Sequence, residues 1–329
     1  MFNLQDCFKN RTVPPSIQKN IEGFVLQYTK ALQANGYGEE VAAPLIRTYI
    51  DLILTQIEHP YHFDLFHQRI LSPFNHYQFG LDFARHWIKM NASTVHHPEN
   101  LETISTQLSK GENVILLANH QTEADPQVIS VLLEKTHPKL AEEMIFIAGH
   151  RVVTDPMAAA MSKGCNLLCI FSKKYIDSAP ECKHERLVHN QRTMKRMSQL
   201  LAEGGKCIYV APSGGRDRLD PNGNVIVASF DPKSIEMFRL MAKKIKEDAL
   251  THFYPFAMET YHLLPPPKNS KIELGEERIL RAVPVHIAFG AEINMDAFAE
   301  SDKEKQRTAR AQFIWGQVNQ LYQEIKEPI

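Results

Sequence analysis

The chain has 329 residues, enough for one large domain or two unequal domains with a sizeable hydrophobic core. Its 37 Lys and Arg residues against 38 Asp and Glu residues leave a formal net charge of −1, which argues against a globally basic nucleic-acid-binding protein. With 43% hydrophobic and 23% charged residues, the composition is that of an ordinary globular protein rather than a disordered or fibrous one.

Five cysteines, an odd number without a CxxC pair, indicate neither a disulfide framework nor a zinc site. The histidines form no HxxxH or HExxH pattern, so no metal is expected. No stretch approaches the roughly 18 consecutive apolar residues of a membrane-spanning helix, and the first residues do not read as a signal peptide. We therefore expect an unprocessed cytoplasmic protein.

Helical periodicity marks the beginning of the chain. Residues 16–36 and 41–57 place apolar side chains three or four positions apart, the spacing that forms one stripe on a helix. A third helix is expected over residues 64–71, before Ser72-Pro73. The sequence therefore predicts a small helical bundle domain over residues 1–75.

Beyond Gly111 short apolar runs alternate with helical stretches, which is typical of an α/β domain. The strand candidates are residues 114–117, 144–147, 167–170, 207–210, 253–258 and 283–289. A closing helix is expected over about residues 303–326. The sequence therefore predicts a larger α/β domain over residues 76–329.

The loop after the first of these strands reads Asn119-His120-Gln-Thr-Glu-Ala-Asp125-Pro126. On one helix, His120 and Asp125 would lie about 140° apart, so a loop must bring them together. With Pro126 at the first helical position and Asp125 as N-cap, the carboxylate can reach back to the imidazole. Such a pair is a general base and the group that orients it.

The spacing alone is weak support, because His59–Asp64 and His150–Asp155 share it. A helix cap beside an ordinary loop histidine is the plain alternative. The copy at residues 120–125 differs because short polar or small residues separate its two ends, whereas apolar residues lie inside the copy at 150–155.

A glycine-rich loop with two arginines, Pro212-Ser-Gly-Gly-Arg216-Asp-Arg218, follows another strand candidate. Glycines let the backbone approach a ligand, and guanidinium groups match phosphate oxygens. The segment Lys173–Arg218 carries ten Lys or Arg against five Asp or Glu, although a solvated helix face explains part of this charge equally well. The sequence therefore predicts an anion site here.

Ser213 in the same loop also approximates the G-x-S-x-G nucleophile elbow of serine hydrolases, with Ala211 in place of the first glycine. A downstream base would come from His252, His262 or His286. Against this alternative, Pro212 and the double glycine are a poor start to a helix.

In this order the motifs resemble the soluble, plastid-type glycerol-3-phosphate acyltransferases. The resemblance rests on Ser72-Pro-Phe, Phe79–Asp82, Asn119–Pro126, Asn166–Lys174, Ala211–Arg218, Tyr254-Pro and Pro265–Pro267. It implies a small helical bundle followed by a larger α/β domain with a mixed sheet. It also implies transfer of a fatty acyl group from a thioester to the sn-1 hydroxyl of glycerol 3-phosphate, forming lysophosphatidate.

The resemblance assigns roles to residues. His120 becomes the general base and Asp125 the group that orients it. The phosphate ligands fall on Lys174, Arg216 and Arg218. Plant members have a histidine after that lysine, where this chain has Tyr175, whose hydroxyl can donate a hydrogen bond but carries no positive charge at neutral pH. No cofactor is implied.

The acyl donor stays open between acyl carrier protein and coenzyme A, because the basic segment suits an acidic protein or nucleotide phosphates. Peripheral contact with a membrane is open too, since the product is an amphiphile. The alternatives to an acyltransferase are a serine hydrolase that uses Ser213 and a non-catalytic protein that binds a phospho-ligand or acyl carrier protein.

Overall fold

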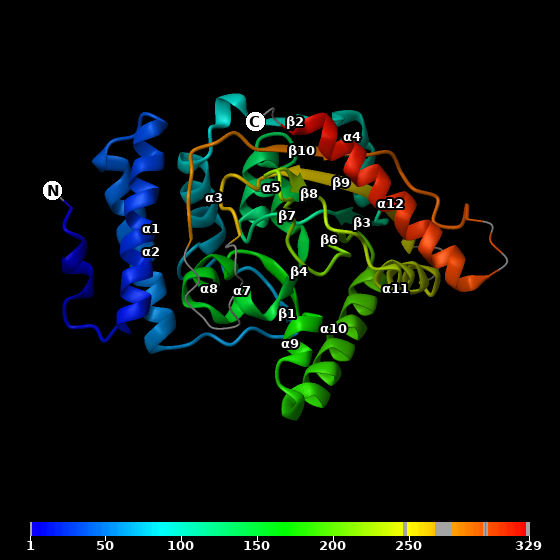
Figure 1. Ribbon diagram of the computed structural model, residues 1–329, viewed down its shortest axis with the longest axis horizontal. Coiled ribbons are helices and arrows are strands. Elements are labelled where there is room, and N and C mark those ends of the chain that lie inside the picture. Colours follow the sequence, from blue (N-terminus) through cyan, green and yellow to red (C-terminus); the bar gives the residue numbers. More distant parts are fainter. Residues whose placement is uncertain (1, 246–248, 267–277, 299, 301, 327–329) are drawn as a thin grey trace.

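The computed structural model describes residues 2–245, 249–266, 278–298, 300 and 302–326, and Figure 1 shows how its helices and strands are arranged. Pro267 of the proline run and the side chain of Lys174 lie outside this described part. Within it, no helix combines the length and the apolar character needed to cross a membrane.

The first two predicted helices are confirmed as α1 (Pro15–Ala34) and α2 (Glu39–Glu58), after a short 3-10 helix η1 (Leu4–Phe8). They lie side by side at one end of the molecule (Figure 1). Their apolar stripes are buried, as the periodicity predicts, with Tyr28 and Ile50 fully enclosed. Tyr49 of α2 donates a hydrogen bond to the carbonyl of Met157, 3.0 Å away, in the α/β part of the chain.

The third predicted helix, over residues 64–71, is wrong. Phe66 and His67 form the short strand β1, which pairs antiparallel with Leu168 and Leu167 of the main sheet. Pairing with a sheet edge outweighs the weak helical preference of a short segment. Strand β1 thus joins the main sheet from inside the segment predicted as a bundle, and the division into domains at residue 75 stays a prediction.

A mixed eight-stranded sheet forms the centre, in the order β1-β5-β4-β6-β3-β9-β10-β2. Five neighbouring strands, β5 to β9 in that order, run parallel, while β1 is antiparallel to β5, β10 is antiparallel to β9, and β2 is parallel to β10. The strands are β1 (Phe66–His67), β2 (Thr94–His96), β3 (Asn113–Ala118), β4 (Ile145–Gly149), β5 (Asn166–Ile170), β6 (Cys207–Val210), β9 (Thr251–Glu259) and β10 (His286–Phe289). All six predicted strands are confirmed, and the predicted mixed α/β fold with them.

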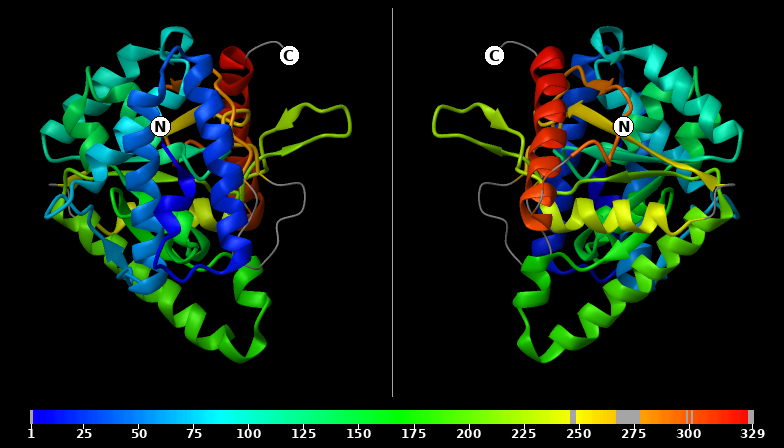
Figure 2. Two further views of the ribbon diagram at one scale, coloured as in Figure 1. Left: turned by 90° about the vertical axis from the view of Figure 1, so that its left-hand side faces the viewer. Right: turned by 90° about the vertical axis from the view of Figure 1, so that its right-hand side faces the viewer.

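Helices cover both faces of this sheet (Figures 1 and 2). Alternate residues of β3 point into two cores, Leu116 into one and Leu117 into the other. Besides α1 and α2, the first core is covered by α3 (His76–Trp87), α4 (Pro98–Ser109), α5 (Asp125–Leu133), α6 (Pro138–Glu143), α7 (His150–Thr154) and α8 (Pro156–Ser162). The second is covered by α10 (Lys183–Glu203), α11 (Pro232–Lys243) and α12 (Lys303–Ile325). The remaining short helices are η2 (Met90–Ala92), α9 (Lys173–Asp177) and η3 (Pro180–Cys182).

The carboxyl ends of the parallel strands form one edge, where open α/β sheets bind their ligands. His120 follows β3, and the arginine loop, defined here as residues 212–218, follows β6 beside it. Lys174 and Tyr175 follow β5, with β4 between β5 and β6. The arginine loop leads into a hairpin, β7 (Arg218–Leu219) and β8 (Val225–Ile226), which projects from the body (Figure 2).

Candidate active site

His120 and Asp125 meet in the loop after β3. Nδ1 of His120 lies 2.8 Å from Oδ2 of Asp125, so the imidazole donates this hydrogen bond to the carboxylate. The side chain of His120 is 30% exposed and that of Asp125 only 1%. Nε2 of His120 makes no hydrogen bond to a described residue, so its lone pair is available to a substrate.

Three further donors hold the carboxylate of Asp125. Oδ2 accepts the backbone N–H of Gln121 at 3.0 Å, and Oδ1 accepts that of Thr122 at 3.2 Å and the hydroxyl of Thr260 at 2.7 Å. The predicted role as N-cap is wrong, because Ala124 occupies that position and Asp125 is the first residue of α5. Both oxygens are engaged by the preceding loop and by Thr260, which leaves the carboxylate fixed toward His120.

Asp217 joins the arginine loop to the loop of His120. Its Oδ2 accepts the side-chain amides of Asn119 at 2.9 Å and Gln121 at 3.2 Å, and its backbone N–H donates to the carbonyl of His120 at 2.7 Å. Burial raises the pKa of this carboxyl above its ordinary value, while the hydrogen bonds it accepts act to lower it. The two loops are therefore held as one unit.

Arg216 and Arg218 lie on that same unit. Arg216 is half-buried, and Arg218 is exposed at the start of β7. Burial raises the pKa of Tyr261, and the two guanidinium groups act against this by favouring the phenolate. Because the backbone N–H of Tyr261 donates to the side chain of Gln121 at 2.8 Å, the arginines lie close to the loop that carries His120.

Lys174 and Tyr175 belong to α9, farther along the same edge of the sheet. The side chain of Lys174 lies outside the described part, so its predicted role stays a prediction. The ring of Tyr175 packs edge-on against His150, with centroids 5.9 Å apart. Strands β5 and β6 lie two spacings apart, roughly 10 Å, so Tyr175 is separated from the arginine loop by the width of β4.

Ser213 does not have the setting of a hydrolase nucleophile. Among the described residues its hydroxyl hydrogen-bonds the carbonyl of Gly215, at 2.9 Å, and no histidine. Gly214 has a φ of +68°, a conformation that suits glycine, and the chain continues into a hairpin rather than a helix. His252, one of the bases considered for it, is held between Glu112 and Glu292.

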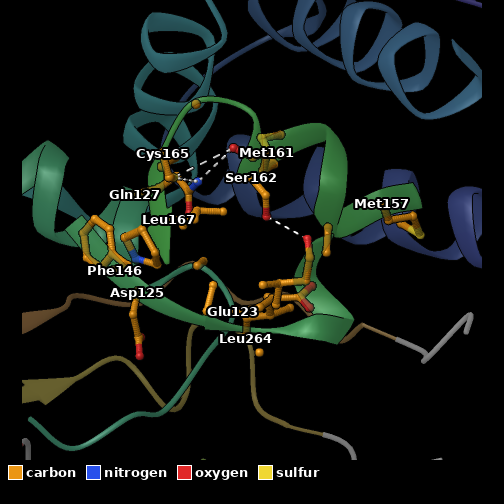
Figure 3. Close-up of a pocket in the computed structure, with 18 of the residues that line it drawn as sticks. Glu123, Asp125, Gln127, Phe146, Met157, Met161, Ser162, Cys165, Leu167 and Leu264 are labelled. Atoms are coloured by element: carbon orange, nitrogen blue, oxygen red, sulfur yellow. Dashed lines mark hydrogen bonds between the residues drawn. The ribbon is translucent and has the colours of Figure 1, made fainter. Parts of the chain in front are cut away.

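An apolar cavity of about 130 Å³ lies beside His120 (Figure 3). Residues far apart in the chain form its walls, and the aromatic and aliphatic side chains among them include Phe24, Tyr49, Phe83, Trp87, Phe146, Met157, Met161, Cys165, Leu167 and Leu264. Gln127 donates to the carbonyl of Met161 and to Sγ of Cys165, each 3.4 Å away, on one side of the cavity (Figure 3). An apolar cavity that begins at His120 suits a linear acyl chain.

Arg278 ties this cavity to the loop of His120, a contact that no sequence motif indicated. It is 5% exposed, pairs with Glu123 and lies 3.1 Å from Oδ1 of Asp155. Asp155 in turn accepts the backbone N–H of Met157 at 3.0 Å, at the start of α8. Burial lowers the pKa of the Arg278 guanidinium, but the two carboxylates outweigh it and raise the pKa.

The cysteines near the site are not placed for chemistry. All five are free thiols, and burial raises the pKa of Cys165, Cys169 and Cys207 to about 12 each. These thiols are protonated at neutral pH and so are poor nucleophiles. In the part of the chain that the structure describes, no group of three or more His, Cys, Asp or Glu side chains is arranged to hold a metal ion.

Known proteins are similar in sequence to most of this chain. The acyltransferase family model matches residues 92–259. A chloroplastic glycerol-3-phosphate acyltransferase of Cucurbita moschata is 35% identical over 335 residues, covering 99% of this chain and 72% of the relative. This chain belongs to the glycerol-3-phosphate acyltransferase family. The resemblance recognised in the motifs is thus confirmed.

Other relatives agree with this membership. The chloroplastic glycerol-3-phosphate acyltransferases of Spinacia oleracea and Arabidopsis thaliana are 34% and 32% identical, each over 96% of this chain and over 68% and 70% of their own lengths. Among solved structures, the 1-acyl-sn-glycerophosphate acyltransferase of Thermotoga maritima is 19% identical, with a TM-score of 0.44, and the match covers 77% of this chain and 79% of that one. The part of this chain that the acyltransferase family model matches, residues 92–259, includes His120, Asp125 and the arginine loop.

Proposed function

We propose that this chain transfers a fatty acyl group from an acyl thioester to the sn-1 hydroxyl of glycerol 3-phosphate, forming lysophosphatidate. The observation that carries the proposal is the pairing of His120 and Asp125 at 2.8 Å between an apolar cavity and the arginine loop. The cavity suits the acyl chain, the arginine loop suits the phosphate, and the imidazole lies where the two substrates would meet.

In the proposed reaction, Nε2 of His120 accepts the proton of the sn-1 hydroxyl as that oxygen attacks the thioester carbonyl. Asp125, which accepts the Nδ1 proton, keeps the ring in the required tautomer and stabilises the imidazolium that forms. A C–O bond forms, the C–S bond breaks, and the imidazolium returns its proton to the departing thiolate. The buried cysteines and Ser213 take no part, because the acyl group passes directly to the acceptor.

The phosphate of glycerol 3-phosphate is proposed to bind Arg216 and Arg218, with Lys174 and Tyr175 as further ligands from α9. Guanidinium groups offer planar pairs of donors that match phosphate oxygens, and a glycine-rich loop lets the backbone approach them. The hydrogen bonds of Asp217 to the loop of His120 support this proposal, because they fix the distance between the phosphate ligands and the base.

The donor is proposed to be acyl carrier protein or coenzyme A, since both present the acyl group as a thioester on a phosphopantetheine arm. A cytoplasmic location stays a prediction from the sequence, because the relatives that match are named chloroplastic proteins.

The test is an assay of purified wild-type protein with each acyl thioester and glycerol 3-phosphate, with lysophosphatidate measured as product. His120→Ala is expected to lower turnover by about 10² to 10⁴, the usual contribution of a positioned general base. Ser213→Ala is the matched control, because its loss removes only a hydrogen bond to Gly215 and should leave turnover within a few-fold. Turnover by His120→Ala at the wild-type rate would exclude the proposed base, and loss in Ser213→Ala alone would favour a serine hydrolase.

A further inference from the structure

His150 lies at the ligand-binding edge of the sheet, in a place that no motif assigns. It follows β4 directly, and β4 lies between β5 and β6. The two groups of proposed phosphate ligands follow β5 and β6, so the topology puts His150 between them. Gly149, its neighbour in the chain, lines the apolar cavity.

A rigid aromatic platform holds the His150 ring. The imidazole of His150 stacks on the ring of Phe171, with centroids 4.4 Å apart and planes inclined by 29°. It also makes a T-shaped contact with the ring of Tyr175. Phe171 is itself fixed, because its backbone N–H and carbonyl both hydrogen-bond the side chain of Asn190 at 2.8 Å. The imidazole therefore has a set orientation, while its nitrogens form no hydrogen bond to a described residue.

A guanidinium group lies beside the aromatic platform of His150. Arg186 lies over Phe171 at 5.4 Å, and His189 meets the same ring edge-on at 5.0 Å. Burial lowers the pKa of His150, and Arg186 and His189 lower it further, while no carboxylate of the described residues acts on it. A half-buried position with donors available and positive charge uncompensated favours an anion.

We propose that His150 is a further phosphate-binding residue, whose ring N–H donates to a phosphate ester carried by one of the two substrates, with Arg186 supplying positive charge beside it. The proposal rests on the proposed function for the identity of those substrates. The phosphate belongs either to glycerol 3-phosphate or to the phosphopantetheine arm of the acyl donor, since both carry the same chemical group to this edge.

The kinetic test uses His150→Phe, which keeps a ring to stack on Phe171 and removes both nitrogens. One Michaelis constant is expected to rise about tenfold, the loss of one hydrogen bond to a charged group, with kcat changed less. A rise for glycerol 3-phosphate alone assigns its phosphate to the site, and a rise for the donor alone assigns the phosphopantetheine phosphate. His184→Gln, which removes an exposed histidine of α10, is the control and should change neither constant.

A second measurement needs neither a folded variant nor turnover. Diethyl pyrocarbonate modifies accessible imidazoles, and trypsin releases His150 as the sole histidine of peptide 140–151 and His189 as the sole histidine of peptide 187–192. Inorganic phosphate and glycerol 3-phosphate, each added to wild-type protein, should slow modification of peptide 140–151 several-fold. His189 is the internal reference, since its Nε2 already hydrogen-bonds the carbonyl of Cys169 at 2.9 Å.

The outcomes separate this proposal from the proposed function. Protection of peptide 140–151 by phosphate in a protein without acyltransferase activity would support the site and refute the function. Unchanged Michaelis constants in a folded His150→Phe variant, or equal modification of peptide 140–151 with and without either phosphate compound, would overturn the role of His150 while leaving the acyltransferase proposal intact.

Discussion

Replacing Asp125 by Asn tests the proposed catalytic pair most directly, because it changes one atom of a buried side chain. The carboxylate accepts four hydrogen bonds, two on each oxygen. An amide has one oxygen, so its NH₂ group must face one of the two pairs of donors. If the oxygen stays with Thr122 and Thr260, the NH₂ faces Nδ1 of His120 and the backbone N–H of Gln121.

His120 can then hydrogen-bond the amide only by accepting at Nδ1, which moves its proton to Nε2 and removes the base. We expect kcat to fall by about 10² to 10⁴, the contribution of general-base catalysis. The backbone N–H of Gln121 would then face the amide NH₂ and be left as a buried donor without an acceptor. This should lower the free energy of unfolding by about 1 to 3 kcal/mol. The Michaelis constant for glycerol 3-phosphate should change little, because the substitution leaves Arg216 and Arg218, the proposed phosphate ligands, unchanged.

The assay combines steady-state kinetics with urea unfolding of the same preparation. Asp155→Asn is the matched control: it also alters a carboxylate that is 1% exposed, but one without a hydrogen bond to His120. It should lower stability with kcat reduced less than tenfold. The reasoning would be refuted by a folded Asp125→Asn protein whose kcat stays within tenfold of wild type, or by equal losses of kcat in the two variants.

Two further predictions concern buried charges. Arg278→Met should lower the free energy of unfolding by about 3 to 5 kcal/mol in urea titrations, since it removes the buried cation that pairs with the half-buried Glu123 and the buried Asp155; a loss below 1 kcal/mol would contradict this. Burial, with Lys163 nearby, lowers the pKa of His76 to about 4, so between pH 6.5 and 4 the unfolded chain binds a proton that the native protein does not. Stability should therefore fall by about 3 kcal/mol across this window, and His76→Gln should flatten the pH profile by that amount; an unchanged profile would refute the assignment.

The parts of the fold that local pattern specifies were predictable. Strand residues such as Leu116 and Leu117 are buried on both faces, so their segment reads as a continuous apolar run. The segment of Phe66 shows the limit, because its conformation depends on pairing with Leu168, about a hundred residues later in the chain. Short strands at a sheet edge carry too few residues for a period of two to be recognised.

The same distinction holds in the site. His120 and Asp125 are five residues apart, so their meeting follows from a single loop and was predictable. The groups that fix them are distant in sequence: Thr260 reaches Asp125 across 135 positions, and Arg278 reaches Glu123 across 155. No local pattern marks such partners. Asp217 could have been suspected from its place between two arginines, although its role as an acceptor for the loop of His120 required the three-dimensional structure.

One part of the cavity wall is built by residues that the family model does not cover. The model spans residues 92–259, which contain His120 and the arginine loop, whereas Phe24, Tyr49, Phe83 and Trp87 precede it. Under the proposed function, substitutions among these four aromatic side chains would change the space for the acyl tail while leaving His120, Asp125 and the arginine loop in place.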